Sequence, residues 1–145
     1  MNDTVNAPAT GGGMDLAALD TSEMSNRGIE VRIFNPKTQK DTDIVITVLG
    51  QDSDAYRAVQ RKQQARSLNA ALKTGPRREE GMVNAAEDNL PEMLAATTTS
   101  WVGILKDGKD YPFSKSNALW LYENYPLIRD QVLEQQRDRA NFLDS

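Results

Sequence analysis

The chain has 145 residues, a formal net charge of −4, no cysteine and no histidine. This length is typical of a single domain. The missing cysteines exclude disulfides and thiolate metal sites, the missing histidines exclude the commonest general base, and the net negative charge argues against general affinity for nucleic acid, which depends on cations that bind phosphates.

The first 27 residues have the composition of a flexible acidic arm. Four acids precede the first basic residue, Arg27, and three consecutive glycines follow residue 10. We therefore predict that residues 1–27 are disordered, with the alternative that Met14–Leu19 forms a short helix that orders on a partner. The sequence has no apolar run long enough to span a membrane and no signal-peptide pattern, so we expect a cytoplasmic location.

Residues 28–50 have the pattern of an antiparallel β-hairpin. Apolar and polar residues alternate over 29–34, and β-branched residues recur at every second position over 43–49. The polar segment Asn35–Asp41 between them has the chemistry of a turn. Because an isolated two-stranded hairpin is unstable in water, we expect it to pack on helices or to pair with another sheet or a second copy of the chain.

Residues 53–73 predict a long helix. The segment is rich in good helix formers, contains no glycine or proline, and follows a candidate cap at Asp52 or Ser53. From Ser53 to Arg78 the sequence has seven basic residues and one acid, a local charge of +6. Three interpretations stay open: a solvated helix that lies on an acidic neighbour, a surface for an acidic protein partner, or a nucleic-acid site.

Residues 79–94 predict a second helix of the opposite charge. The acids without a base among them are Glu79, Glu80, Glu87, Asp88 and Glu92. Apolar residues recur here at helical spacing, and Pro91 predicts a kink or a break near Asp88–Leu90. With a short Gly-Pro turn between the two helices, residues 53–98 predict an antiparallel helical hairpin, which the opposite charges help to close.

Residues 99–145 predict a helical module that holds most of the aromatic core. Both tryptophans of the chain lie here, and aromatic side chains bury the most area per residue. An Asp-Gly turn at Asp107 predicts two very short strands, Ser114 predicts a helix cap, and Pro126 predicts the first residue of a last helix that runs to about Phe142. The expected fold is α+β and mostly α-helical, with an N-terminal hairpin followed by four or five helices.

Neighbouring acids are the best candidates for an enzyme active site. They are Glu79 with Glu80, Glu87 with Asp88, and Asp107 and Asp110 with Asp41 and Asp43. Carboxylates alone can hold the magnesium ion of a nuclease. However, no motif links two of these sets, and such acids are typical of helix starts and turns. We therefore predict no enzyme activity, no metal site and no cofactor.

Several short motifs follow one another between residues 28 and 143. They are Gly50–Ser53 with Tyr56 and Arg57, Trp101–Ile104, Asp107–Lys109, Pro112–Ser114, Tyr125–Val132 and Asp138–Phe142. In their order and spacing they resemble the tail assembly chaperones of long-tailed, siphovirus-like bacteriophages.

The resemblance implies a non-enzymatic protein that acts in the host cell cytoplasm. Chaperones of this family bind the tape measure protein, a very long, largely helical and aggregation-prone chain. They keep it soluble while tail tube protein polymerises around it, and they are absent from the mature virion. The expected partners are therefore the tape measure protein, the tail tube protein and a further copy of this chain, with neither nucleic acid nor membrane among them.

A helical client needs an exposed helix face or an apolar groove. The predicted core does not cover the surface of the helix over 53–73 or the edge of the hairpin. Both are therefore candidates for client binding or self-association. The candidate partner-binding residues are Tyr56, Val59, Arg61, Lys62, Arg66, Leu68 and Leu72. The candidate core residues of the scaffold are Trp101, Ile104, Phe113, Leu119, Trp120, Tyr125, Ile128, Val132 and Phe142.

Two other functions stay open. The chain could be a small structural part of a virion, such as a minor tail or connector protein. It could also be a small nucleic-acid-binding regulator that uses the basic helix, which predicts salt-sensitive binding to DNA.

Overall fold

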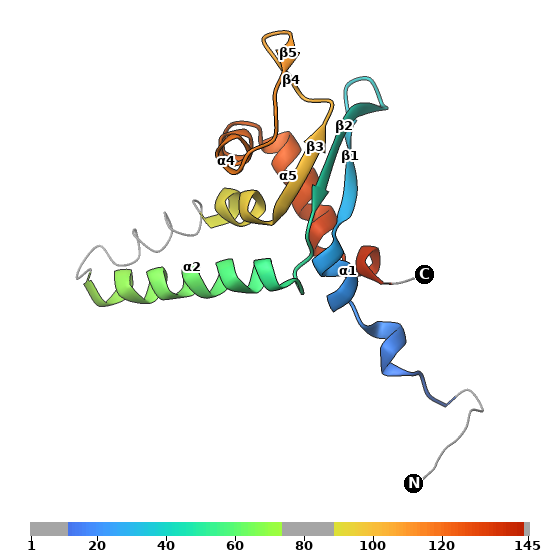
Figure 1. Ribbon diagram of the computed structural model, residues 1–145, viewed down its shortest axis with the longest axis vertical. Coiled ribbons are helices and arrows are strands. Elements are labelled where there is room, and N and C mark those ends of the chain that lie inside the picture. The colour runs from blue at the N-terminus through green and yellow to red at the C-terminus, as the bar shows by residue number, and fades with distance from the viewer. Residues whose placement is uncertain (1–11, 74–88, 144–145) are drawn as a thin grey trace.

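The computed structural model of the protein describes residues 12–73 and 89–143, which form an α+β fold (Figure 1). A three-stranded antiparallel sheet has the order β1-β2-β3, and a separate two-stranded ribbon consists of β4 and β5. The strands are β1 (Ile29–Asn35), β2 (Lys40–Val48), β3 (Thr98–Val102), β4 (Leu105–Lys106) and β5 (Lys109–Asp110). The helices are the 3-10 helix η1 (Leu16–Leu19), α1 (Ser22–Arg27), α2 (Asp54–Lys73), α4 (Lys115–Asn124), α5 (Pro126–Arg137) and the 3-10 helix η2 (Arg139–Phe142), and residues 89–97 are also helical. The predicted α+β class is confirmed.

The predicted hairpin is present as β1 and β2. Its turn is fixed by Asn35, whose side chain accepts a hydrogen bond from the Lys37 N–H at 2.9 Å. The two strands pair in register from Ile29 opposite Val48, and the register shifts between Arg32 and Phe34. This shift is a bulge on β2, which has more residues than β1 over the same length of ladder.

The hairpin is not the N-terminal element, which corrects the prediction from sequence. η1 and α1 precede it, and α1 places Ser25 in a buried position with a side chain 1% exposed. The predicted disordered arm is therefore wrong for residues 21–27, which are held by packing against the C-terminal end of the chain. η1 buries no residue, and residues 1–11 lie outside the described part of the chain.

A third strand, β3, was not expected from the sequence. In the segment predicted as a helical hairpin, 53–98, the observed helix ends at residue 97. The chain then runs along β2 as a strand, with Trp101 opposite Ile46. Thr98 joins the two structures, because its hydroxyl donates to the Leu94 carbonyl at 2.7 Å. The threonine run is β-branched and favours a strand once a partner strand is available. The predicted acidic helix lies partly outside the described residues.

The core lies between one face of the three-stranded sheet and the helices α4 and α5. α5 packs on β1 and β2, and α4 packs on α5. The core residues are Val31, Ile33, Ile46, Val48, Leu94, Ala95, Trp101, Ile104, Ala118, Leu121, Tyr122, Ile128 and Val132. Burial raises the pKa of Tyr122 to about 12, and its hydroxyl lies 2.8 Å from that of Thr98. The hairpin thus supplies a large share of a core that the sequence placed mainly in the last third of the chain.

The predicted signals for the last two helices are confirmed. Ser114 caps α4, since its hydroxyl accepts a hydrogen bond from the Asn117 N–H at 3.0 Å. Pro126 opens α5, where its missing N–H costs no helical hydrogen bond. The predicted last helix ends at Arg137, earlier than expected, and η2 continues the chain to the buried Phe142.

Candidate partner-binding surfaces

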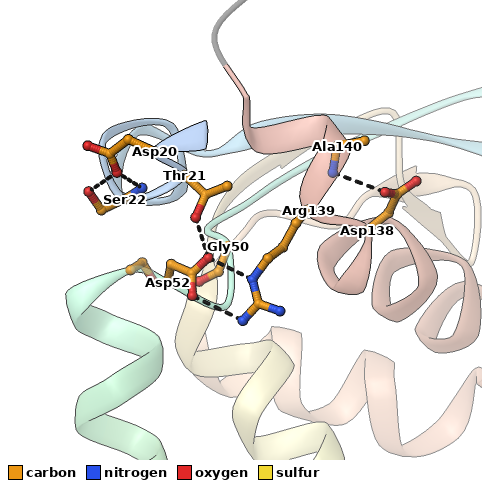
Figure 2. Close-up of polar contacts among 9 residues, drawn as sticks. Asp20, Thr21, Ser22, Gly50, Asp52, Asp138, Arg139 and Ala140 are labelled. Carbon is orange, nitrogen blue, oxygen red and sulfur yellow. Dashed lines mark hydrogen bonds and ion pairs between the residues drawn. The ribbon is translucent and has the colours of Figure 1, made fainter. Parts of the chain in front are cut away.

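A polar cluster fixes the start of α2 and joins three segments that are far apart in the sequence. Asp52 accepts hydrogen bonds from Arg139 Nε at 2.9 Å, from Arg139 Nη2 at 3.1 Å and from Thr21 Oγ1 at 2.5 Å (Figure 2). The hydrogen bonds from Arg139 and then Thr21 hold the pKa of the Asp52 carboxyl below its usual value. Of the two predicted caps, Ser53 caps α2 by accepting a hydrogen bond from the Tyr56 N–H at 3.1 Å.

The inner face of α2 packs against the helical residues 89–97. Gln63 Nε2 donates to the Asn89 carbonyl at 2.8 Å and to Glu92 Oε1 at 3.0 Å. Arg66 forms an ion pair with Glu92 and donates to Asn89 Oδ1 at 3.2 Å. Partial burial raises the pKa of Glu92, but the hydrogen bonds from Arg66 and Gln63 outweigh it and keep that pKa below its usual value. α2 is thus held to its neighbour by charge as well as by packing.

The seven predicted partner-binding residues do not share one surface. Tyr56 and Val59 are half-buried on the inner face of α2, where Arg66 is paired with Glu92. The other four are exposed, namely Arg61, Lys62, Leu68 and Leu72. The first three residues therefore lie on the face that attaches α2 to the rest of the protein, and the other four lie on faces exposed to solvent.

The outer face of α2 is a continuous exposed stripe. We define it by residues that recur every three or four positions: Arg57, Arg61, Ala65, Leu68 and Leu72. Leu68 is 62% exposed and Leu72 is 77% exposed. In Figure 1 α2 extends away from the sheet, and the helical residues 89–97 lie along one side of it. The half of the stripe near the sheet is basic, and the far half is apolar.

A second surface is formed by aromatic side chains at the β4–β5 ribbon. The Trp101 ring stacks on Tyr111 at 5.9 Å between centroids, and the Trp101 indole N–H donates to the Tyr111 carbonyl at 2.8 Å. Tyr111 meets Trp120 edge to face at 5.8 Å, and Trp120 contacts Tyr125 at 5.6 Å. Lys106 Nζ lies 5.1 Å from the centre of the Trp120 ring. This chain of rings runs from the buried core to the solvent.

Three of these rings, Tyr111, Trp120 and Tyr125, line an open groove of about 500 Å³, here called the aromatic groove. Its lining residues are Ile44, Ile104, Leu105, Lys106, Asp107, Tyr111, Trp120, Leu121, Tyr125 and Ile128. Leu105 at its rim is 67% exposed. The groove has the apolar, aromatic lining with few charges that is typical of sites for apolar ligands or side chains.

The predicted scaffold core is confirmed for most of its residues. Those buried are Trp101, Ile104, Ile128, Val132 and Phe142, and those half-buried are Phe113, Leu119 and Trp120. Tyr125 is wrong as a core residue, because it is 47% exposed at the rim of the aromatic groove. It lies between α4 and α5, where its ring contacts that of Trp120 at 5.6 Å between centroids.

Only part of the predicted acidic sets lies within the described residues. Asp107 and Asp110 belong to the β4–β5 ribbon and Asp41 lies in β2, whereas Glu79 with Glu80 and Glu87 with Asp88 fall outside the described residues. Within residues 12–73 and 89–143, no cluster of three or more carboxylates is placed to hold a metal ion. None of the helices in this same part of the chain is long and apolar enough to cross a membrane.

Sequence reasoning missed the aromatic groove, although its signal was present. Tyr111, Trp120 and Tyr125 lie within fifteen residues of one another, but their spacing gave no sign that a ribbon would hold them at the surface. Comparison with protein-family models, with curated proteins and with solved structures found no match to this chain.

Proposed function

We propose that the protein is a tail assembly chaperone of a long-tailed bacteriophage. It binds the tape measure protein in the host cytoplasm, keeps it soluble, and promotes polymerisation of tail tube protein around it without remaining in the virion. It has no enzyme activity and needs no cofactor. The proposal is supported by the ordered motifs between residues 28 and 143 and by two surfaces that the protein's own packing leaves open.

The single observation that carries the proposal is the outer face of α2. Leu68 and Leu72 lie one turn apart, and both are largely exposed. The only acidic residue of α2 is Asp54. A client helix with an apolar stripe and acidic flanks fits such a surface, because its leucine-sized side chains cover the two leucines and its acids meet Arg57 and Arg61.

Repeated weak binding suits a client that must later be displaced. One exposed stripe on a helix of about 30 Å supplies modest affinity. Many copies along one long client add avidity without any stronger single contact. Polymerising tube protein then removes the copies one at a time.

The test is co-expression of the protein with the tape measure protein of its own phage. We expect the client to become soluble and to co-purify with the wild-type protein. We expect the double substitution Leu68→Glu with Leu72→Glu to abolish both effects, since it places two negative charges where the client's apolar stripe binds. Leu16→Glu is the matched control, because Leu16 is 83% exposed but lies on η1. A client that stays insoluble with the wild-type protein, or that is rescued equally by the double variant, contradicts the proposal.

The aromatic groove favours a second function, that of a minor tail or connector protein. An exposed groove lined by Trp120 and Tyr125 resembles the anchor pockets of stable protein interfaces. Mass spectrometry of purified virions separates the two functions: a chaperone is missing, whereas a connector is present in a few copies per particle.

A further inference from the structure

We propose that the free edge of β1 pairs with the same edge of a second copy of this chain, which gives a two-fold symmetric dimer with a continuous six-stranded sheet. β1 is an outer strand of the sheet, with β2 on one side only. A strand edge with unpaired backbone groups is a template for another strand. This inference does not depend on the proposed client.

The pairing pattern shows which residues of β1 face outward. The Ile33 carbonyl accepts a hydrogen bond from Thr42 Oγ1 on β2 at 2.7 Å, so the backbone polar groups of Ile33 point toward β2. The backbone N–H and carbonyl of Phe34 point away from β2, to the outer edge of the sheet, because both are bound by the side-chain amide of Gln131 at 2.8 Å. Strand backbone alternates, so Arg32 and Glu30 also direct their N–H and carbonyl groups outward. Within the described residues, these outward groups of Glu30 and Arg32 have no hydrogen-bond partner.

Gln131 sets the limit of the free edge. Its amide occupies the backbone of Phe34 as a neighbouring strand would, and so closes the edge at that residue. A groove of about 540 Å³ runs beside the rest of the edge, with Glu30, Val31 and Arg32 on the β1 side and Gln131 and Glu134 on the α5 side. The edge is therefore open where Glu30 and Arg32 face outward, and blocked one step beyond.

The charges of the edge select a partner and a register. Glu30 and Arg32 are both exposed and project from the same face of the sheet. In a two-fold pair centred on Val31, each Glu30 lies opposite the other copy's Arg32, and four backbone hydrogen bonds form between the two copies. A register shifted by one residue toward the N-terminus places Glu30 opposite Glu30, and a shift toward the C-terminus places Arg32 opposite Arg32 and needs the blocked Phe34. The edge is therefore complementary to itself in one register.

Such a dimer changes how the protein presents its surfaces. The new interface uses β1, whereas the outer face of α2 and the aromatic groove lie on other elements. Each dimer then carries two copies of both surfaces, which makes it bivalent toward any long client. The short edge limits the buried area, so the dimer is of the weak, concentration-dependent kind.

A charge-swap experiment tests the pairing. Sedimentation of the full chain over a range of concentrations gives the dimer dissociation constant, which we expect to rise at least about tenfold in Glu30→Arg and in Arg32→Glu, because each variant sets like charges opposite each other twice. A mixture of the two variants restores dimerisation, since one chain then carries two bases at the edge and the other two acids. Circular dichroism and thermal unfolding show that each variant is folded.

The absence of native cysteine allows a direct test of register. Residues paired in the ladder have Cα atoms about 5.5 Å apart, within the range that a disulfide spans, whereas residues two positions out of register do not. Under mild oxidation, a chain with Glu30→Cys therefore cross-links to a chain with Arg32→Cys faster than either chain cross-links to itself.

Three outcomes overturn the inference. The first is a wild-type chain that sediments as a monomer at every concentration. The second is a mixture of the charge variants that associates no better than each variant alone. The third is loss of client binding in the charge variants while the wild-type chain is monomeric, which assigns the β1 edge to an extended client segment instead. Failure of the Leu68 and Leu72 variants to affect the client leaves this inference standing and contradicts only the proposed function.

Discussion

At Gly103 the backbone has a φ of +83°, and a Cβ placed there would lie 2.1 Å from the Asp43 carbonyl oxygen. The residue lies between β3 and the β4–β5 ribbon, where the chain crosses the bulge of β2. No side chain other than hydrogen fits this contact, because the neighbouring atom belongs to backbone and cannot rotate away. One residue thus allows the third strand to close on the hairpin and still turn toward the ribbon that carries the aromatic groove.

The substitution Gly103→Ala tests this close approach. We expect the free energy of unfolding to fall by about 3 kcal/mol, because both the left-handed backbone and the clash oppose an alanine. Gly108→Ala is the control, since Gly108 has a φ of +76° but no atom within 4 Å of the added Cβ. It isolates the backbone cost, about 1 kcal/mol. Equal losses in equilibrium urea denaturation would show that the contact with Asp43 is not decisive.

The cluster at Asp52 has a defined pH dependence. Hydrogen bonds from Arg139 and Thr21 lower the folded-state pKa of Asp52 below that of the unfolded chain, about 3.9. The contribution to stability is therefore present above about pH 4 and is lost as the pH falls through the lower, folded-state pKa.

We expect Asp52→Asn to lower the free energy of unfolding by about 1 kcal/mol at neutral pH, and the difference from wild type to shrink as the pH falls below about 4. Asp107→Asn is the control, because the Asp107 side chain is 91% exposed and its ion pair with Lys106 is loose, with 3.9 Å between Nζ and Oδ2. Urea denaturation at a series of pH values measures both. A difference that grows on acidification would mean that the cluster does not stabilise the charged form of Asp52.

At the scale of elements, α2 has two faces with different tasks. The inner face attaches it to residues 89–97 through Gln63 and Arg66, and the outer face is free. The weak apolar periodicity of α2 follows from this division. A helix that packs along one narrow side needs few large apolar residues there, and its leucines at the far end of the outer face are not part of the core.

Two arginines of α2 allow a matched comparison of these faces. Arg66→Ala removes the ion pair with Glu92 and loosens α2, for a loss of up to about 1 kcal/mol in the free energy of unfolding, since the pair is partly exposed. Arg61→Ala removes an exposed charge with little effect on stability. If the outer face binds the proposed client, we expect Arg61→Ala to weaken client binding although it leaves the free energy of unfolding nearly unchanged. A larger stability loss in Arg61→Ala than in Arg66→Ala would reverse the assignment of the two faces.

At the scale of the whole molecule, the protein combines a tightly packed body with a projecting helix. β2 is paired on both sides and its Ile46 and Val48 are fully buried, whereas α2 contacts the body along one side and carries mostly exposed residues (Figure 1). Local opening costs least where few apolar contacts must break. The surface proposed for the client therefore lies on an element that opens more easily than the central strand of the sheet.

Amide hydrogen exchange measures this difference. We expect the amides of α2 to exchange through local opening, faster than those of β2 and α5, whose exchange requires global unfolding. Binding of a client to the outer face then slows exchange in α2 selectively. Protection in α2 equal to that in β2 in the free protein would show that α2 belongs to the same cooperative unit.

Local signals were enough to predict much of the fold. The Asn35–Asp41 turn, the cap at Ser53, the cap at Ser114 and the start at Pro126 each act through residues a few positions away, so a single sequence reveals them. Burial of most scaffold residues followed from their apolar character. The opposite charges of the two helices predicted an attraction between them, and Arg66 pairs with Glu92 accordingly, but the sequence did not show which basic residue of α2 forms that pair.

The sequence by itself determined the hairpin, the long basic helix and the two C-terminal helices, because turn residues, caps and helix formers act over short range. The tertiary structure decided three other features: β3 pairs with a strand about fifty residues earlier, α1 packs against η2 near the other end of the chain, and Tyr125 lies at the surface. Pairing and burial of this kind depend on which segments meet after folding. The free edge of β1 is likewise a property of the assembled sheet, since only the sheet order leaves one side of that strand without a neighbour.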